Sequence, residues 1–490
     1  MIWTESGKDG GNVDKAYQNI SYQKVNPPVQ HWPKSPVSLT KETMDQRLNK
    51  VLRWMEEKET DVLCVYADRE HGGNFGYLTG FEPRFEEAVL VLHRDGKAFL
   101  MLGNESLRMG NYCRIKNTVI HVPHFSLPNQ PMETEFTLRE LFEKAGISQR
   151  MCIGIAGWKL FTSHKEDNAQ LFEVPYMIVE SIKSAVGKQG RVQNEGGLFI
   201  APDTGVRVLN NANEIAHFEY GAALASDCVL EALEQVETGK TELEIADCLA
   251  ACGQPVNVQT ICATGERFTN AEVAPRNKKI ALGDTFSVTM GLRGGLTSRA
   301  GYIARCREDL PEKACDYMEK MAVPYFAAAA AWFETVGIGV TGGELYEIIE
   351  RVLPKSEYGW VLNPGHLTSS EEWLSSPIER DSAICLKSGM MLQMDIIPKR
   401  AGYGGASAED GIVIADEALR DEIRSKYPET WERMCRRRKY MAEELGIRLK
   451  EEILPMSDST GYFRPYLLNK GYALKNMSCT SCTDFDIITS

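Results

Sequence analysis

The chain has 490 residues, with Lys+Arg 55 against Asp+Glu 68 and a formal net charge of −13. This length predicts two or three domains, and the acidic balance disfavours nucleic acids and anionic membranes as partners. No apolar run approaches the roughly 20 residues of a membrane span, and no secretory signal is recognisable. The 13 cysteines are odd in number and scattered, which favours reduced thiols and a cytoplasmic location. We interpret the close pair Cys479 and Cys482 as incidental thiols.

The first half of the chain has the pattern of an α/β domain. Residues 1–38 are polar and become proline-rich, which predicts an N-terminal arm, and the α/β domain is expected over residues 39–205. Its first helix is indicated by apolar residues at helical spacing from Met44 to Met55. The strands that follow read DVLCVYA, EAVLVLH, AFLMLG and CIGIAG, and the middle two predict a hairpin around the turn Arg94-Asp95-Gly96.

A second domain is expected over residues 206–450, followed by a C-terminal extension over 451–490. Its opening helix follows the segment NANE, in which Asn211 and Glu214 can form a capping box. Residues 416–446 predict one charged helix, and we expect its basic run RRRK to form a solvated face rather than a binding patch.

The second domain contains an internal repeat. Residues 236–249 read VETGKTELEIADCL and residues 336–349 read VGIGVTGGELYEII, so glycine, threonine, glutamate and apolar positions match 100 residues apart. Each copy leads to a second matched phrase, GDTFSVTMG from Gly283 and GMMLQMDII from Gly389. Such a duplication indicates a pseudo-symmetric architecture. We predict two halves, each with a long helix, a glycine turn, a capped second helix and strands, which place helices on a curved antiparallel sheet.

The two copies differ at one position that decides the chemistry. The sixth residue after the glycine is Thr289 in the first copy and Asp395 in the second. A carboxylate within the apolar strand MMLQMDII needs partners, because burying an unpaired charge is costly. We therefore place the candidate site beside this strand.

These features together resemble the pita-bread family of creatinase, prolidase, Xaa-Pro aminopeptidase and methionine aminopeptidase. The resemblance covers roughly residues 43–450, and its late motifs GHLTSSEEW, SGMMLQMDIIP and GGASAEDGIVIAD follow in the expected order. It implies a creatinase-like α/β N-terminal domain, an α+β pita-bread C-terminal domain with a pseudo-two-fold repeat, and a homodimer.

The resemblance also implies where a metal site would lie. Metal-dependent members hold two divalent ions with two aspartates, one histidine and two glutamates, whose carboxylates offset the charge of the ions. In this sequence the five positions fall on His366, Asp395, Glu409, Thr289 and either Arg299 or Ala300. Threonine is a poor ligand, and neither arginine nor alanine can bind a metal. The sequence therefore predicts no cofactor, or at most one divalent ion on His366, Asp395 and Glu409.

Two histidines that metal peptidases of this family carry are replaced as well. The first falls on Glu272, twelve residues before Asp284, and the second on Trp373, seven residues after His366. Glu272 is either a catalytic residue or a solvated loop residue. Trp373 either stacks on a ligand or fills core. Arg299 either clamps a substrate carboxylate or fills the place of a metal.

Three functions remain open from the sequence. The favoured hypothesis is a creatinase-like, metal-independent hydrolase of a C–N bond in a small amine, guanidino or carboxylate substrate. In it His366, Asp395, Glu409 and Glu272 are the catalytic residues, and the substrate is bound by Arg299, Trp373 and Thr289. The second is an Xaa-Pro peptidase-like metallohydrolase with a single ion. The third is a non-catalytic protein that binds a small molecule or a partner.

Overall fold

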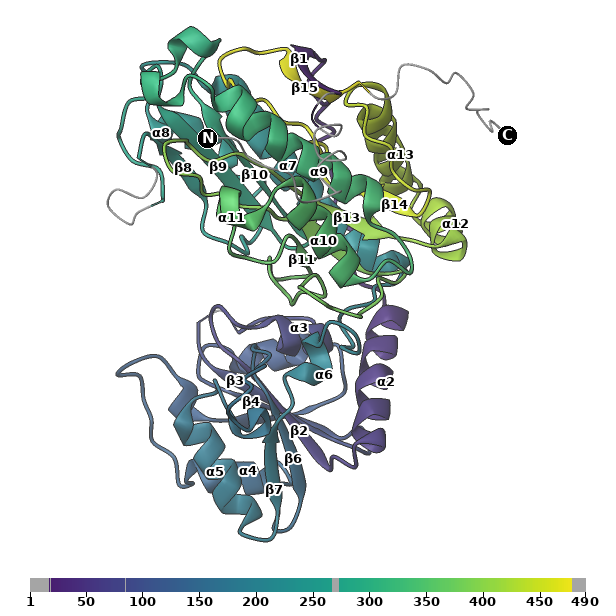
Figure 1. Cartoon of the computed structure of the whole chain (residues 1–490). Coiled ribbons are helices and arrows are strands. Elements are labelled where there is room, and N and C mark those ends of the chain that lie inside the picture. Colours follow the sequence, from purple (N-terminus) through teal and green to yellow (C-terminus); the bar gives the residue numbers. More distant parts are fainter. Residues whose placement is uncertain (1–16, 18, 84, 267–272, 478–490) are drawn as a thin grey trace. The chain divides into compact units, whose positions relative to one another are not determined.

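The computed structural model describes residues 17, 19–83, 85–266 and 273–477. The chain divides into two compact units, one formed by Ser38–Leu209 and the other by Met1–Val37 together with Asn210–Ser490 (Figure 1). The candidate residue Glu272 and the pair Cys479 and Cys482 lie outside the described residues.

The unit Ser38–Leu209 is built on one mixed sheet with the strand order β5-β4-β3-β2-β6-β7. Its strands are β2 (Val62–Ala67), β3 (Ala88–His93), β4 (Ala98–Leu102), β5 (Thr118–His121), β6 (Cys152–Ala156) and β7 (Arg191–Asn194). Its helices are α2 (Lys41–Glu57), α3 (Gly73–Thr79), α4 (Leu138–Lys144), α5 (Tyr176–Val186) and α6 (Gly197–Ile200). The predicted α/β fold of this unit is confirmed.

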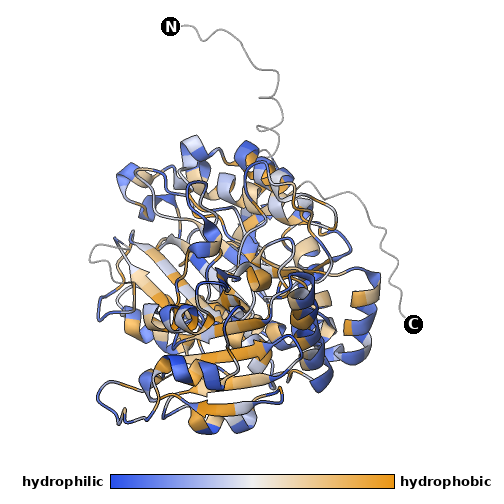
Figure 2. Ribbon diagram, turned by 90° about the horizontal axis from the view of Figure 1, so that it is seen from below, coloured by the Kyte–Doolittle hydropathy of each residue, from blue (hydrophilic) through white to orange (hydrophobic). Residues whose placement is uncertain are grey.

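The predicted hairpin is the centre of this sheet. Strands β3 and β4 pair antiparallel, and Gly96 in the turn between them has a φ of +85°, a conformation that glycine adopts without a steric penalty. Strand β2 is buried at every position, and it is paired on both edges, by β3 and by β6. Figure 2 shows the apolar residues concentrated on the strands and the hydrophilic residues on the outer helices.

The second unit carries the candidate site on an antiparallel sheet. In the described residues its strand order is β11-β12-β13-β10-β9-β8, and β14 adds to β13. The strands are β8 (Ile261–Thr264), β9 (Thr285–Leu292), β10 (Gly295–Tyr302), β11 (His366–Leu367), β12 (Met391–Met394), β13 (Ser407–Ile414) and β14 (Ile453–Pro455). A separate pair joins the two ends of the unit, β1 (Ile20–Lys24) and β15 (Tyr472–Asn476).

The helices of this unit follow the predicted repeat. They are α7 (Ala212–Gln235), α8 (Glu242–Ala246), α9 (Val323–Thr335, preceded by a π-helical turn), α10 (Gly342–Val352), α11 (Lys355–Tyr358), α12 (Glu417–Lys426) and α13 (Pro428–Glu443). Capping boxes start α7, α8 and α10, and the turn glycines Gly239 and Gly339 have φ of +91° and +83°. The strand order β8-β9-β10 is mirrored by β11-β12-β13, so the pseudo-two-fold runs between β10 and β13. No helix of the described residues is long and apolar enough to cross a membrane.

Helix α7 packs on one face of strands β9 and β10 (Figure 1). Val288 and Met290 of β9 lie in one apolar cluster with Leu224 and Val229 of α7. Because strand residues alternate between faces, Thr289 points to the opposite face. The candidate site therefore lies on the face of the sheet that α7 does not cover.

The prediction of a single helix over residues 416–446 is wrong. Helices α12 and α13 are separated at Tyr427, whose backbone leaves the helical conformation with φ of −133° and ψ of 58°, because Pro428 follows it and disfavours that conformation. The expectation that the whole basic run is solvated is also incorrect, since Arg437 is 2 % exposed.

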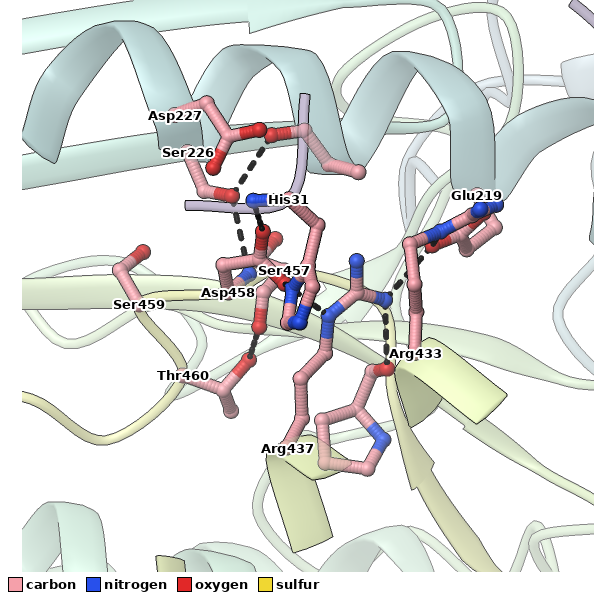
Figure 3. A network of polar contacts seen from close by, with 12 residues as sticks. His31, Glu219, Ser226, Asp227, Arg433, Arg437, Ser457, Asp458, Ser459 and Thr460 are labelled. Atoms are coloured by element: carbon pink, nitrogen blue, oxygen red, sulfur yellow. Dashed lines mark hydrogen bonds and ion pairs between the residues drawn. The ribbon is translucent and has the colours of Figure 1, made fainter. Parts of the chain in front are cut away.

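Arg437 is the centre of a buried polar network that holds the N-terminal arm (Figure 3). Its guanidinium pairs with Asp458 at 2.5 Å and with Glu219 of α7 at 2.7 Å. The arm adds the imidazole of His31, 2.8 Å from the same Asp458 carboxylate. The backbone N–H of Trp32 donates to Asp227 of α7 at 2.6 Å. The arm is thus tied to the helices of the second unit by charge-assisted hydrogen bonds.

The two aspartates of this network hold opposite charge states. Burial and the neighbouring Asp458 raise the pKa of Asp227 to about 9, so its carboxyl is protonated at neutral pH. Burial opposes ionisation of Asp458 as well, but Arg437 and His31 outweigh it and lower the pKa of this carboxyl. One ionised and one protonated carboxyl avoid the repulsion of two buried charges.

Two substitutions test the protonation states of Asp227 and Asp458 separately. Asn resembles a protonated acid, so Asp227→Asn should change the free energy of unfolding by less than about 1 kcal/mol. Asp458→Asn leaves Arg437 buried without this partner and should cost about 3–5 kcal/mol. The measurement is urea unfolding of both variants.

The pH dependence gives a second check on Asp227. Its pKa is higher in the folded than in the unfolded state, so its contribution to stability is complete below pH ~4 and declines as the pH rises to about 9. The stability of the wild type relative to Asp227→Asn should fall across this window. An Asp227→Asn variant as unstable as Asp458→Asn would contradict the assignment.

Candidate cation-binding site

Three predicted site residues lie together in the second unit. One ligand atom from each of His366, Asp395 and Glu409 lies within 4.8 Å of the other two, and all three residues are buried. His366 is fully buried, and Asp395 and Glu409 are 5 % and 7 % exposed. They come from β11, from the end of β12 and from β13.

The strand register explains why these side chains meet. His366 pairs with Gln393, so their side chains share a face of the sheet, and Asp395 points to that same face two residues further along. On the other side of β13, Glu409 pairs with Ser298, which in turn pairs with Thr289. The predicted site residues Thr289, Asp395 and Glu409 therefore face the same side.

Arg299 lies on the opposite face. It pairs with Val288, which packs under α7, and its guanidinium forms an ion pair with Asp410 at 2.5 Å. Its remaining donors bond at 2.6–3.1 Å to the backbone carbonyls of Ser298, Glu409, Ser459 and Tyr462. The expectations that Arg299 clamps a substrate carboxylate or fills the place of a metal are therefore wrong, because alternation along β10 turns it away.

The same register settles the choice between Arg299 and Ala300. Ala300 pairs with Ser287 and with Ser407, so it points to the face of the site. In the described residues, the strands β9 and β10 present hydroxyl groups to this half of the site. Thr289 donates a 2.8 Å hydrogen bond to Ser298, and the buried hydroxyl of Ser287 has no hydrogen-bond partner.

The imidazole of His366 is fixed on two sides. Its Nδ1 lies 3.1 Å from the carbonyl oxygen of Leu367, which can only accept, so Nδ1 carries a proton. The indole of Trp373 stacks on the imidazole with 4.2 Å between ring centroids and 22° between planes. Trp373 remains 37 % exposed, so it does not belong to the core. One face of its indole is covered by the imidazole of His366. In a neutral ring Nε2 then presents its lone pair to the carboxylates.

Glu372 is a site residue that the sequence analysis did not identify. Its Oε1 lies 2.9 Å from His366 Nε2, and its side chain is 20 % exposed. It precedes Trp373 on the loop that follows β11. The sequence did contain a signal for Glu372: it is a carboxylate next to Trp373, which stands at the position of the second family histidine.

The carboxylates of the cluster repel one another. Burial and the nearby charge of Glu372 raise the pKa of Asp395 to about 6, although His366 acts in the opposite direction. Burial, Asp395 and Glu372 raise the pKa of Glu409 well above its ordinary value. For His366 burial favours the neutral ring, but Glu372 and Asp395 outweigh it and raise its pKa. In water-poor surroundings such a cluster gains stability from a cation.

Comparison with known proteins agrees with this architecture. Residues 216–416 match metallopeptidase family M24. A search of curated proteins finds no match. Among solved structures, the prolidase from Pyrococcus horikoshii OT3 is 17 % identical with a TM-score of 0.59 over 76 % of this chain and 95 % of that chain. The chain has the fold of these structures, an α/β N-terminal domain followed by a pita-bread C-terminal domain.

Two further pita-bread structures are similar to this chain. A dipeptidase from Pyrococcus horikoshii OT3 is 21 % identical with a TM-score of 0.57, over 75 % of this chain and 94 % of that chain. An X-Pro aminopeptidase from Thermotoga maritima MSB8 is 15 % identical with a TM-score of 0.57, over 76 % and 95 %. At these identities the likeness establishes the fold, while the chemistry must be argued from the residues of this chain.

Among the described residues of this chain, His366, Asp395 and Glu409 could together hold one divalent cation. His366 Nε2 lies 3.9 Å from Asp395 Oδ2, close to twice the ~2.0–2.1 Å of a metal–ligand bond. Neither His366 Nε2 nor Asp395 Oδ1 has a hydrogen-bond partner, although both are buried. The other half of the site offers Thr289 and Ala300, which carry no charge to offset a second ion.

The assignment of Arg299 to the far face has a direct test. Arg299→Met leaves Asp410 buried without its partner and should lower the free energy of unfolding by about 3–5 kcal/mol. Cation affinity of the folded Arg299→Met protein should stay within about threefold of wild type, because the guanidinium does not face the cluster. A stable variant with abolished cation or substrate binding would contradict the assignment. Both quantities come from unfolding curves and calorimetry with Mn²⁺.

Proposed function

We propose that this chain is a hydrolase that cleaves an amide-type C–N bond in a small substrate and holds one divalent cation on His366, Asp395 and Glu409. The observation that carries the proposal is the buried convergence of these three donors, in which Nε2 and Oδ1 have no hydrogen bond. The match of residues 216–416 to metallopeptidase family M24 supports the reaction class. An imidazole with two carboxylates suits Mn²⁺, Fe²⁺, Co²⁺ or Zn²⁺.

A bound divalent cation would polarise the scissile carbonyl and lower the pKa of a water molecule. The chain's own residues orient the donors. The Leu367 carbonyl holds the proton on His366 Nδ1, and Trp373 keeps the ring plane fixed. Such support commonly sets the orientation and basicity of a ligating histidine.

The hydroxyl-lined half of the site is proposed to bind the substrate. Thr289 and Ser298 are hydrogen-bonded to each other and buried, and Ser287 has an unused hydroxyl. Neutral hydroxyls can donate to or accept from a peptide group without attracting a second metal ion. The exposed face of Trp373 adds an apolar surface beside His366.

The metal-independent, creatinase-like hydrolase is the second candidate. The mutual repulsion of Asp395, Glu409 and Glu372 favours it, because an amine or guanidinium group of a substrate can supply the missing positive charge. Arg299 weakens it, since the residue expected to hold a substrate carboxylate lies on the other face. The homodimer and the cytoplasmic location stay predictions.

Metal content separates these two candidates. After incubation with Mn²⁺, Co²⁺, Fe²⁺ or Zn²⁺ and removal of free ions, the protein should retain about one ion per chain. Asp395→Asn should lose it, because the amide has no charge to offset the ion. Retention of two ions, or of none under any condition, would contradict the single-ion site. The measurement is elemental analysis of wild type and variant in parallel.

Turnover separates an enzyme from a binding protein. Dipeptides, including Xaa-Pro dipeptides, and N-acyl amines should be hydrolysed by the loaded protein, and Asp395→Asn should reduce kcat/KM at least about 100-fold. Unchanged turnover after chelation would favour the metal-independent candidate. A ligand-induced rise in Tm without turnover would favour a binding protein. The readout is the release of free amine.

A further inference from the structure

Glu372 has no counterpart among the five ligand positions of the site, yet it is in contact with His366. Its Oε1 lies 2.9 Å from Nε2, the atom that faces the cluster. At this separation an N–H···O hydrogen bond is expected, but Nε2 has no hydrogen-bond partner. The carboxylate oxygen therefore lies to the side of the direction in which an Nε2–H bond would point.

This arrangement resembles two donors beside one ion more than a hydrogen-bonded pair. Ligands at right angles around an ion, each about 2.1 Å from it, are about 3 Å apart. The 2.9 Å from Glu372 Oε1 to His366 Nε2 agrees with such neighbours, and the 3.9 Å from Nε2 to Asp395 Oδ2 agrees with a wider ligand angle. Glu372 lies outside the tight three-residue cluster, and its side chain is 20 % exposed, whereas the other three donors are buried.

The charge of the site points in the same direction. Among the described residues, the ligand positions of one half are occupied by Thr289 and Ala300, neither of which carries a carboxylate. Glu372 is an additional carboxylate on the other half, with its Oε1 2.9 Å from His366 Nε2. Carboxylates located in only one half of the site would concentrate the negative charge around a single ion.

The loop that carries Glu372 is held in place. The backbone N–H of Leu367 donates to Ser375, and that of Leu374 donates to Leu367, so the chain returns beside β11. The stack of Trp373 on His366 fixes the neighbouring residue. Glu372 is thus presented to the cluster by a structured loop.

From these contacts we propose that Glu372 is a fourth protein ligand of the cation held by His366, Asp395 and Glu409. This proposal rests on the single-ion site of the proposed function. It assigns to this chain a site of one imidazole and three carboxylates, of which one reaches in from the surface. The alternative for Glu372 is a competing counter-ion, which would hold His366 and hinder the ion from binding.

The test is Mn²⁺ affinity by calorimetry on wild type, Glu372→Gln and Glu371→Gln. Glu371 is the preceding residue on the same loop, so its substitution removes the same charge from the same segment. Glu372→Gln should weaken Mn²⁺ binding about 10–100-fold, Glu372→Asp should restore part of it, and Glu371→Gln should stay within about threefold of wild type. With Co²⁺, the visible absorption of Glu372→Gln should change in intensity, since one ligand is replaced.

The outcomes distinguish the role proposed for Glu372 from the single-ion site on which it rests. Binding of one ion by wild type, with equal affinity and an unchanged Co²⁺ spectrum in Glu372→Gln, would overturn the role of Glu372 and leave the single-ion site intact. Tighter binding by Glu372→Gln would also overturn it, because Glu372 would then be a competitor. Absence of binding by wild type would overturn both. Unfolding curves of the three variants confirm that each is folded when it is measured.

Discussion

The pairing of β10 with β13 is the constraint on which the site depends. Three pairs, from Ser298 with Glu409 to Ala300 with Ser407, join the two pseudo-symmetric halves of the sheet. This short ladder decides which side chains reach the site, because a shift by one residue would exchange the two faces. It directs Glu409 toward His366 and Asp395, and it directs Arg299 into a buried ion pair on the other face.

The two halves have diverged around this common frame. The capped helices α8 and α10 and the turn glycines before them are retained in both copies. At the matched strand position one copy has Thr289 and the other Asp395. The first half therefore presents neutral hydroxyls and the second presents carboxylates and an imidazole. A site with acidic groups on one side is suited to one cation and leaves the other side for a neutral substrate.

Much of the fold followed from local signals, and the remainder depended on register. The cap at Asn211 and a capped second helix in each repeat were predicted because the capping box is a local motif. Arg299 was placed in the site because the sequence left a one-residue ambiguity, and only strand pairing shows that Ala300 faces the cluster. Glu372 was missed because its contact with His366 depends on how the loop after β11 returns. The break at Pro428 could have been read from the sequence, since proline restricts the residue before it.

The central claim is that His366, Asp395 and Glu409 hold a single cation. Crystals soaked in Mn²⁺, with diffraction recorded at a wavelength where manganese scatters anomalously, would locate any ion directly. The account predicts one anomalous peak per chain, within bonding distance of His366 Nε2 and of one oxygen each from Asp395 and Glu409. Two peaks, a peak beside Thr289, or an ordered water network without any peak would contradict it.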